Sequence, residues 1–304
     1  MSLIVTGTIG IDTVHTPTGK AEGVLGGSCA YFAAAASFLA PVRVVAAVGG
    51  DWPLEHRAIL EGFENICLEG LQHRPRSRTF AWGGRYFENM NQRETLFTEL
   101  GVLEEEPPPV PEKYRDSEYV FVANTHPEVQ AGLLKHFPGR KIAVADTMDL
   151  WINIARAELL DVMGQVDGLV LNDSEAEQLT ELSNAVSAAR KILELGPTFV
   201  VVKKGEHGAV LVHRDGVATM PAFPVEQHQV VDPTGAGDAF AGGMMGHLAA
   251  VGMTDFASIQ SALAWGTVTA SFALESFGLD RLAAISRKDI DQRMRDFQAA
   301  ARVG

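Results

Sequence analysis

The run VVDPTGAGDAFAGG, residues 230–243, places a strand-like segment, a glycine-rich turn and a helical pattern in direct succession. Gly235 and Gly237 permit tight backbone geometry and the close approach of a ligand. The helix N-terminus that follows offers unpaired N–H groups and partial positive charge, which suit a phosphate. Asp238, in the first turn, can accept a hydroxyl proton while those N–H groups hold a transferring phosphoryl group. An ordinary glycine-rich turn with a first-turn aspartate has the same composition.

A second candidate is NDSE, residues 172–175, which follows a predicted strand. Asn172 and Glu175 are three residues apart and can face the same ligand, and Mg²⁺ favours oxygen ligands while keeping several waters. The same spacing is that of a helix capping box, with Asn172 as the cap. The two roles can coexist.

Other charged residues have two interpretations each. In DTMDLW, residues 146–151, Asp146 or Asp149 can line a cleft at a strand end or cap a helix. A group of arginines can bind a substrate phosphate or form a solvated or dimer-facing surface. We expect Arg85 and Asn91 to reach inward. The arginines are Arg74, Arg76, Arg78, Arg85 and Arg93.

Composition restricts the function classes. The formal net charge of −13 argues against nucleic acid as the main partner, because nucleic-acid binding depends on neutralising phosphates. Two cysteines are too few for a disulfide framework, and the first ten residues lack a basic region and a long apolar run, so we expect a cytoplasmic protein without membrane attachment. The sequence contains no P-loop motif, and no dinucleotide-binding glycine motif follows the first strand. These absences exclude the two commonest alternative kinds of nucleotide-binding site.

Short β-branched runs alternate with helical patterns along the chain, which predicts βαβ units and a mainly parallel sheet in one domain, residues 1–304. Two stretches, Thr13–Leu25 and Arg74–Gly101, have no helical pattern and are typical of antiparallel hairpins, so we expect a small second sheet inserted in the α/β core. Residues 150–163 are predicted to form one helix.

The run DPTGAGDAF closely resembles the C-terminal signature of the ribokinase-like (PfkB) family of carbohydrate and nucleoside kinases. GTIGID at 7–12, VGGD at 48–51 and NDSE follow the order of other family landmarks, so the resemblance spans nearly the whole chain. It implies an α/β fold, a Rossmann-type three-layer sandwich with a small β-sheet lid. It also implies that Asp238 is the catalytic base and that residues 235–237 (Gly235, Ala236 and Gly237) form an anion hole.

The resemblance implies further site residues. Asp12, Gly26, Gly27 and Tyr31 would contact substrate; Lys203, Gly205, Gly208, Thr234 and Gly237 would contact ATP; and Asn172 and Glu175 would organise Mg²⁺ through water. A monovalent cation such as K⁺ near Asp232 and a homodimer formed through the lid are also implied. Many members have Asn where this chain has Tyr31, and many have Thr where it has Lys203.

The expected activity is therefore transfer of the γ-phosphoryl group of ATP to a hydroxyl of a sugar or related small molecule. Tyr31 removes an amide contact to sugar and puts ribose in doubt. A nucleoside kinase would use Tyr31, Phe32, Trp82 or Tyr86 for base stacking, whereas a sugar-phosphate kinase would use the lid arginines. A non-catalytic ligand-binding protein on the same fold is the remaining alternative.

Overall fold

The central sheet is built from runs of buried β-branched and aromatic residues. The computed structural model describes residues 2–301, and its main sheet has nine strands in the order β13-β12-β11-β10-β9-β8-β1-β4-β5. Seven neighbouring strands pair in parallel, as the β-branched runs predict, and at one edge β12 pairs antiparallel with both β11 and β13. The strands are β1 Leu3–Thr6, β4 Val42–Gly49, β5 Ile66–Arg74, β8 Tyr119–Val122, β9 Ile142–Asp146, β10 Gly168–Asn172, β11 Phe199–Lys203, β12 Ala209–His213 and β13 Gly216–Met220.

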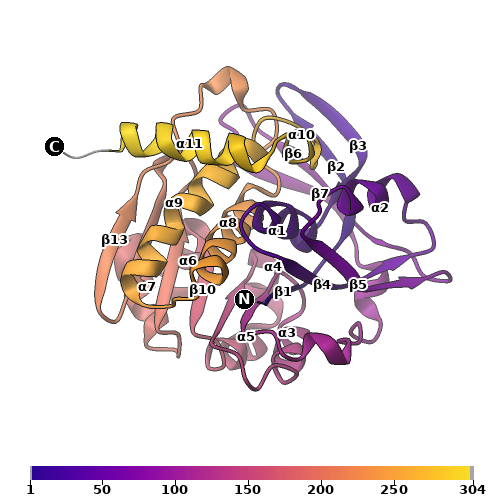
Figure 1. Ribbon diagram of the computed structural model, residues 1–304, viewed down its shortest axis with the longest axis horizontal. Helices are drawn as coiled ribbons and strands as arrows, with labels where there is room; N and C mark the ends of the chain where they lie inside the picture. Colours follow the sequence, from indigo (N-terminus) through magenta and orange to yellow (C-terminus); the bar gives the residue numbers. More distant parts are fainter. Residues whose placement is uncertain (1, 302–304) are drawn as a thin grey trace.

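Helices cover both faces of this sheet, which gives the predicted three layers (Figure 1). In β1, Leu3 and Val5 pack into the core on one face, and Ile4 packs into the core on the other. The first face carries α1 Ser28–Ser37, α2 Leu54–Glu61, α8 Ala236–Val251, α9 Phe256–Ala273, α10 Asp280–Ala284 and α11 Arg287–Ala300. The second carries α3 Pro127–Leu134, α4 Asp149–Ile154, α5 Arg156–Met163, α6 Asp173–Thr180 and α7 Ala185–Leu193.

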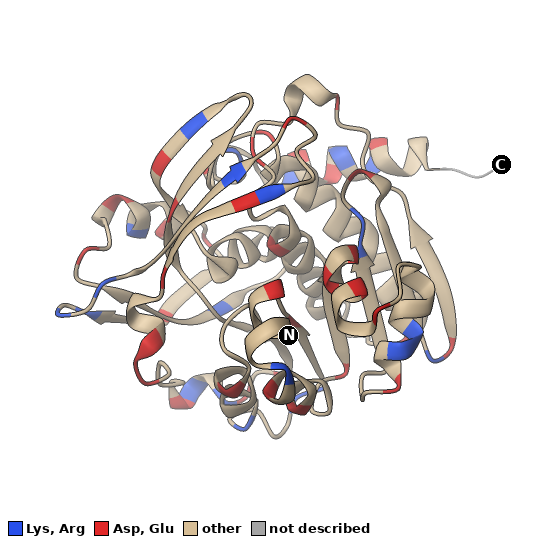
Figure 2. Cartoon of the chain, turned by 180° about the vertical axis from the view of Figure 1, so that it is seen from behind, with Lys and Arg blue, Asp and Glu red and all other residues tan. Residues whose placement is uncertain are grey.

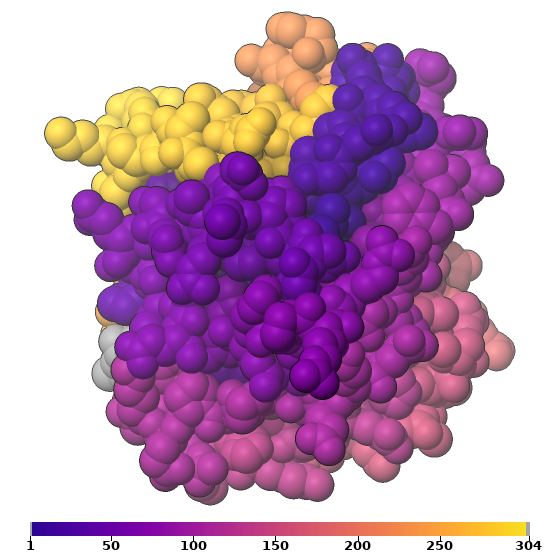
Figure 3. All heavy atoms as spheres, turned by 90° about the vertical axis from the view of Figure 1, so that its right-hand side faces the viewer, coloured from indigo at the N-terminus to yellow at the C-terminus, as the bar shows by residue number. Residues whose placement is uncertain are grey.

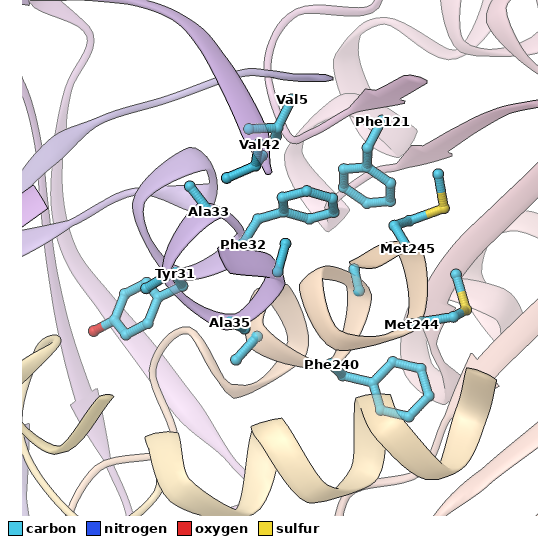
Figure 4. Packing of buried hydrophobic residues seen from close by; sticks show 14 of the residues in the cluster. Val5, Tyr31, Phe32, Ala33, Ala35, Val42, Phe121, Phe240, Met244 and Met245 are labelled. Carbon is cyan, nitrogen blue, oxygen red and sulfur yellow. The ribbon is translucent and has the colours of Figure 1, made fainter. Parts of the chain in front are cut away.

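Helices α1 and α8 pack closely because small residues line their contact. A Cβ on Gly242 would overlap the backbone carbonyl oxygen of Phe32. Phe32 itself stacks on Phe121 of β8, with 4.5 Å between ring centroids. Figure 4 shows Phe32 pointing to Phe121 and Met245 while Tyr31 points the other way. Phe32 is therefore a core residue, and the expectation that it could stack on a nucleobase is wrong.

A separate four-stranded sheet has the order β3-β2-β6-β7. It consists of β2 Gly10–Thr16, β3 Gly19–Gly26, β6 Phe80–Tyr86 and β7 Arg93–Glu99, and we call it the lid. β2 pairs with β3 and β6 with β7 as predicted hairpins, but β2 and β6 join in parallel. Figure 3 shows this side of the molecule, where the indigo N-terminal segment lies beside the yellow C-terminal one.

Two boundaries differ from the sequence prediction. Arg74 ends β5 in the central sheet and does not belong to the lid. Residues 150–163 form two helices, not one, because Ala155 leaves the helical conformation with φ −136° and ψ 40°. Within residues 2–301, no helix has the length and apolar character needed to cross a membrane.

Candidate active site

A cavity lies between the lid and the carboxyl ends of the central strands, where ligands bind in open α/β sheets. Its lining includes the polar residues Thr8, Asp12, Ser28, Thr234 and Asp238. It also includes the apolar residues Phe80, Trp82, Leu100, Leu103, Met148, Leu150 and Trp151. This mixed lining would suit a ligand that has one hydroxyl-bearing part and one flat, apolar part.

The start of α8 contributes part of the polar lining of the cavity. Gly235 precedes the helix with φ +74°, a left-handed conformation that glycine adopts without a side-chain clash. Asp238 lies in the first turn and lines the cavity. Burial raises the pKa of Asp238, while the positive charges of Lys203 and Arg93 oppose that rise. The predicted base and the predicted anion hole thus lie together beside the cavity.

Asp238 has a second carboxyl group next to it. Asp146, the last residue of β9, is 5% exposed, and burial together with the negative charge of the nearby Asp238 raises the pKa of Asp146 well above its usual range. Asp149, the other candidate in this segment, is exposed at the start of α4, and its Oδ1 accepts from the N–H of Leu150 at 3.0 Å. Of the two aspartates, Asp146 is the one that lies near the predicted base.

Asp12, Gly26 and Gly27 come together as predicted. Asp12 is 3% exposed, and it accepts a hydrogen bond from the backbone of Gly27. A Cβ on Gly26 would overlap the Asp12 carboxyl group, so this position requires glycine. Burial, followed by the negative charges of Asp232 and Asp238, raises the pKa of Asp12 to about 8. Asp12 is therefore largely protonated at neutral pH and can donate a hydrogen bond to a ligand.

Tyr31 also lines the cavity, although its side chain is only 1% exposed. Its ring packs directly on Gly235, and its buried hydroxyl has no hydrogen-bond partner among the described residues. Tyr31 therefore supports the turn that begins α8, in addition to closing the cavity wall.

Of the residues predicted to contact a nucleotide, Thr234 lines the cavity and Lys203 lies beside Gly237 of the same turn. The Nζ of Lys203, at the end of β11, is 2.7 Å from the position that a Cβ of Gly237 would occupy. Gly205 and Gly208 have φ of +54° and +82° and form a tight turn directly after Lys203. Thr234 is tied to the lid, because its Oγ1 donates to the Tyr86 hydroxyl at 3.3 Å.

Two lid residues are not where the sequence analysis expected them. Arg85 does not reach inward: its side chain is 52% exposed and lies 3.9 Å from Glu94. Asn91 does not line the cavity either, and its Nδ2 donates to Glu206 Oε1 at 3.0 Å, in the turn after Lys203. Figure 2 shows acidic and basic residues interspersed along the lid strands, so the lid presents no purely basic surface.

Arg93, rather than Arg85, is the lid arginine that lines the cavity, although it too is exposed on one side. Its guanidinium lies 5.6 Å from the Trp82 ring centroid and is hydrogen-bonded to the Tyr86 hydroxyl. Arg93 was one of five arginines noted in the sequence, but nothing in the sequence singled it out. Its position depends on pairing with Tyr86 across the hairpin.

Asn172 and Glu175 form a complete capping box at the start of α6. Asn172 Oδ1 accepts from the N–H of Glu175, and Glu175 Oε2 accepts from the N–H of Asn172, both at 2.8 Å. The capping interpretation is thus confirmed. Residues 2–301 contain no group of three or more His, Cys, Asp or Glu side chains that could hold a metal ion directly. The donor set therefore fits Mg²⁺ only through bound water.

The apolar lining of the cavity was largely missed by the sequence analysis. Trp151 is fixed by a hydrogen bond from its Nε1 to Asn124 Oδ1 at 2.8 Å, and His126 packs edge-on against it. Of the residues expected to stack on a base, Trp82 lines the cavity, whereas Tyr86 is bonded to Thr234 and Arg93. Trp151 stood in the DTMDLW segment, but the sequence alone did not show which way it faced.

Comparison with known proteins agrees with this arrangement. The sequence profile of the pfkB family of carbohydrate kinases matches residues 141–284. A cytidine kinase of Thermococcus kodakarensis is 32% identical over 250 residues, which cover 81% of this chain and 87% of that protein.

Solved structures share the fold at lower identity. A nucleoside kinase of Methanocaldococcus jannaschii from the ribokinase family has a TM-score of 0.76 and 20% identity over 97% of this chain and 98% of its own. A Burkholderia thailandensis nucleoside kinase solved with inosine has a TM-score of 0.75 and 18% identity, covering 98% of this chain and 99% of its own. The chain therefore has the ribokinase fold, belongs to the pfkB family of carbohydrate kinases and is a phosphotransferase that acts on a hydroxyl group.

Proposed function

We propose that this protein is an ATP-dependent nucleoside kinase that phosphorylates a hydroxyl on the sugar of its substrate. The observation that carries the proposal is the mixed lining of the cavity. It combines Asp12, Asp238 and the start of α8 with Trp82, Trp151 and neighbouring aliphatic residues. A nucleoside has both kinds of surface, with a polyhydroxylated sugar and a flat base that stacks on aromatic rings.

In the proposed reaction, Asp238 accepts the proton of the attacking hydroxyl. The N–H groups at the start of α8, residues 235–238, hold the phosphoryl group, because unpaired amides and the helix dipole favour negative charge there. Arg93 faces Asp238 from the lid and adds positive charge on the substrate side. The protonated Asp12 would hydrogen-bond the sugar and fix its orientation.

The apolar part of the lining favours a nucleoside over a free sugar, since a free sugar would leave several apolar side chains without a partner. A sugar phosphate is also less well matched. Arg85, the arginine expected to bind such a phosphate, lies outside the cavity, and Arg93 is already bonded to Tyr86. Relatives that act on nucleosides, such as the cytidine kinase, support the same choice.

ATP would lie on the other side of the α8 turn, with Lys203 and Thr234 near its phosphates and the turn at Gly205 and Gly208 beneath it. Glu175 and Asn172 would hold Mg²⁺ through water, and the metal would offset the negative charge of the phosphates. Asp232 is fully buried, and its Oδ2 has no hydrogen-bond partner among the described residues, which fits a monovalent cation.

A coupled assay of ADP formation tests the proposal. The acceptors are cytidine, inosine and adenosine, compared with ribose, fructose and ribose 5-phosphate, each with ATP and Mg²⁺. We expect turnover with at least one nucleoside at a kcat/KM well above that of any sugar or sugar phosphate. A clear preference for a free sugar or a sugar phosphate would contradict the nucleoside assignment and leave the kinase assignment in place.

A further inference from the structure

Trp151 forms part of the cavity wall, and its indole N–H is bonded within the protein. The residue is 7% exposed, and its Nε1 donates to Asn124 Oδ1 at 2.8 Å. The imidazole ring of His126 packs edge-on against the indole, with 5.1 Å between the ring centroids and 69° between the ring planes. The indole N–H can only donate, so its hydrogen-bonding capacity is already used before a ligand binds.

The side-chain amide of Asn124 has one orientation that satisfies its neighbours. Because the indole N–H is only a donor, the amide oxygen must face Trp151. The amide nitrogen then faces the thioether of Met148, and Nδ2 donates to Sδ at 3.1 Å. The backbone N–H of Trp151 donates to the Met148 carbonyl oxygen, also at 3.1 Å. Asn124 therefore contacts two residues at the start of α4, and all three line the cavity.

The two chain segments that carry Asn124 and Trp151 are joined to each other. Asn124 follows β8 and Trp151 follows β9, and these two strands are parallel neighbours in the central sheet. The side chain of Gln130 is 1% exposed, and its Nε2 donates to the carbonyl oxygens of Val122 and Asp146, both at 3.0 Å. Gln130 thus ties the end of β8 to the end of β9, which fixes the backbone at both segments. The bond to Asn124 then restricts rotation of the Trp151 side chain itself.

We propose that Asn124 is a positioning residue for Trp151: by accepting the indole hydrogen bond, it holds the ring in the cavity wall, where the ring packs against the base of a nucleoside. The Asn124–Trp151 pair thereby sets the preference for nucleosides over acceptors that lack a base. This inference rests on the nucleoside kinase reaction proposed above. A ring that is already oriented loses little freedom when the base binds, which strengthens binding. The Asn124 amide makes its bonds within the protein, so its effect on the base passes through Trp151.

Two acceptors with the same sugar isolate the contribution of the base. Cytidine, or the nucleoside of the panel that turns over fastest, is compared with methyl β-D-ribofuranoside, which has no base. Trp151→Ala should raise KM for the nucleoside by about 10- to 100-fold, the usual effect of removing one aromatic ring that stacks on a base. The KM or inhibition constant of the methyl riboside should change less than about threefold. Trp265→Ala is the matched control and should leave both values unchanged, because Trp265 stacks on His247 outside the cavity lining.

Replacing Asn124 tests whether it acts through the ring. Asn124→Leu keeps a similar volume without the acceptor and should raise KM for the nucleoside by about 3- to 10-fold, the usual cost of immobilising one side chain on binding. Trp151→Phe should reproduce this loss, because it removes the same hydrogen bond. In a Trp151→Ala background, Asn124→Leu should add less than about twofold, since the ring through which it acts is gone. If Trp151→Ala does not fold, Trp151→Phe replaces it in this comparison.

Thermal unfolding and calorimetric binding of ATP check that each variant keeps its fold. A wild-type KM for the nucleoside in Trp151→Ala, or in both Asn124→Leu and Trp151→Phe, would overturn the inference. Equal losses for the nucleoside and the methyl riboside would also overturn it, as would additive losses in the double variant, which would mean that Asn124 contacts the base directly. Absence of turnover with every nucleoside in the wild type would instead refute the proposed function, on which the inference depends.

Discussion

The ring of Tyr31 packs face-on against Gly235, so closely that a Cβ on Gly235 would overlap three of the ring carbons. Tyr31 is on α1 and Gly235 begins α8, and both line the cavity. The aromatic residue that replaces an expected asparagine therefore supports the backbone turn that would hold a phosphate. This contact explains how the bulky side chain of Tyr31 can occupy a position where an asparagine was expected.

This contact predicts opposite results for two substitutions. Gly235→Ala should lower kcat by at least about 100-fold, because the added methyl group displaces either the ring or the amide groups and because alanine is strained at φ +74°. Tyr31→Phe should keep activity and stability, because the hydroxyl it removes has no partner among the described residues. Steady-state kinetics and thermal unfolding of the two variants test this. A loss of activity in Tyr31→Phe would show that the hydroxyl contacts the substrate.

The two lid arginines form a matched pair for testing the cavity. Arg93→Ala should lower kcat/KM by about 10- to 100-fold, since it removes a positive charge facing Asp238 and a hydrogen bond to Tyr86. Arg85→Ala removes an exposed side chain and should change kcat/KM less than about threefold. Equal losses in both variants would contradict the placement of Arg93 in the site. A larger loss in Arg85→Ala would restore the interpretation of Arg85 as the inward-facing residue.

The raised pKa of Asp12 predicts how the free energy of unfolding depends on pH. Its pKa is about 8 in the folded protein and near 3.8 when unfolded, so the folded state binds one more proton between these values. Asp12 thus lowers the free energy of unfolding by up to about 1.4 kcal/mol for each pH unit as pH rises from 4 to 8. Asp12→Asn removes this dependence.

Denaturant unfolding of wild type and Asp12→Asn at pH 5 and pH 8 measures the effect. The free energy of unfolding of Asp12→Asn, relative to wild type, should be higher at pH 8 than at pH 5. Asp232, whose pKa burial raises to about 6, is present in both proteins, so its own titration largely cancels in the comparison. A difference between the two proteins that does not change with pH would mean that Asp12 is already ionised at pH 5.

Local patterns were enough to predict the parallel sheet, the lid hairpins and the place of Asp238 in the first turn of α8. Runs such as FVVV at 199–202 predict buried strands, and a glycine-rich turn before a helical pattern predicts where the helix begins. Asp12, Gly26 and Gly27 were also correctly grouped, because the structure places them close together.

Side-chain direction in the lid could not be predicted. The pairing of β6 with β7 shifts register between Gly83 and Gly84, so Leu96 is passed over and the alternation of faces changes along β7. Such a bulge leaves no clear sign in the sequence, and it contributes to the choice between Arg85 and Arg93. The effect of Asp238 on Asp146 was missed for a different reason: the two residues are 92 positions apart, and only the fold brings their charges close together.

The central claim is that Asp238 is the base of a phosphoryl transfer, and Asp238→Asn tests it most directly. The measurement is kcat for ADP formation with the best nucleoside, alongside calorimetric binding of ATP and thermal unfolding. We predict that the variant folds, binds ATP like the wild type and loses at least about 100-fold in kcat, because an amide cannot accept the hydroxyl proton. A kcat close to that of the wild type in Asp238→Asn would contradict the account.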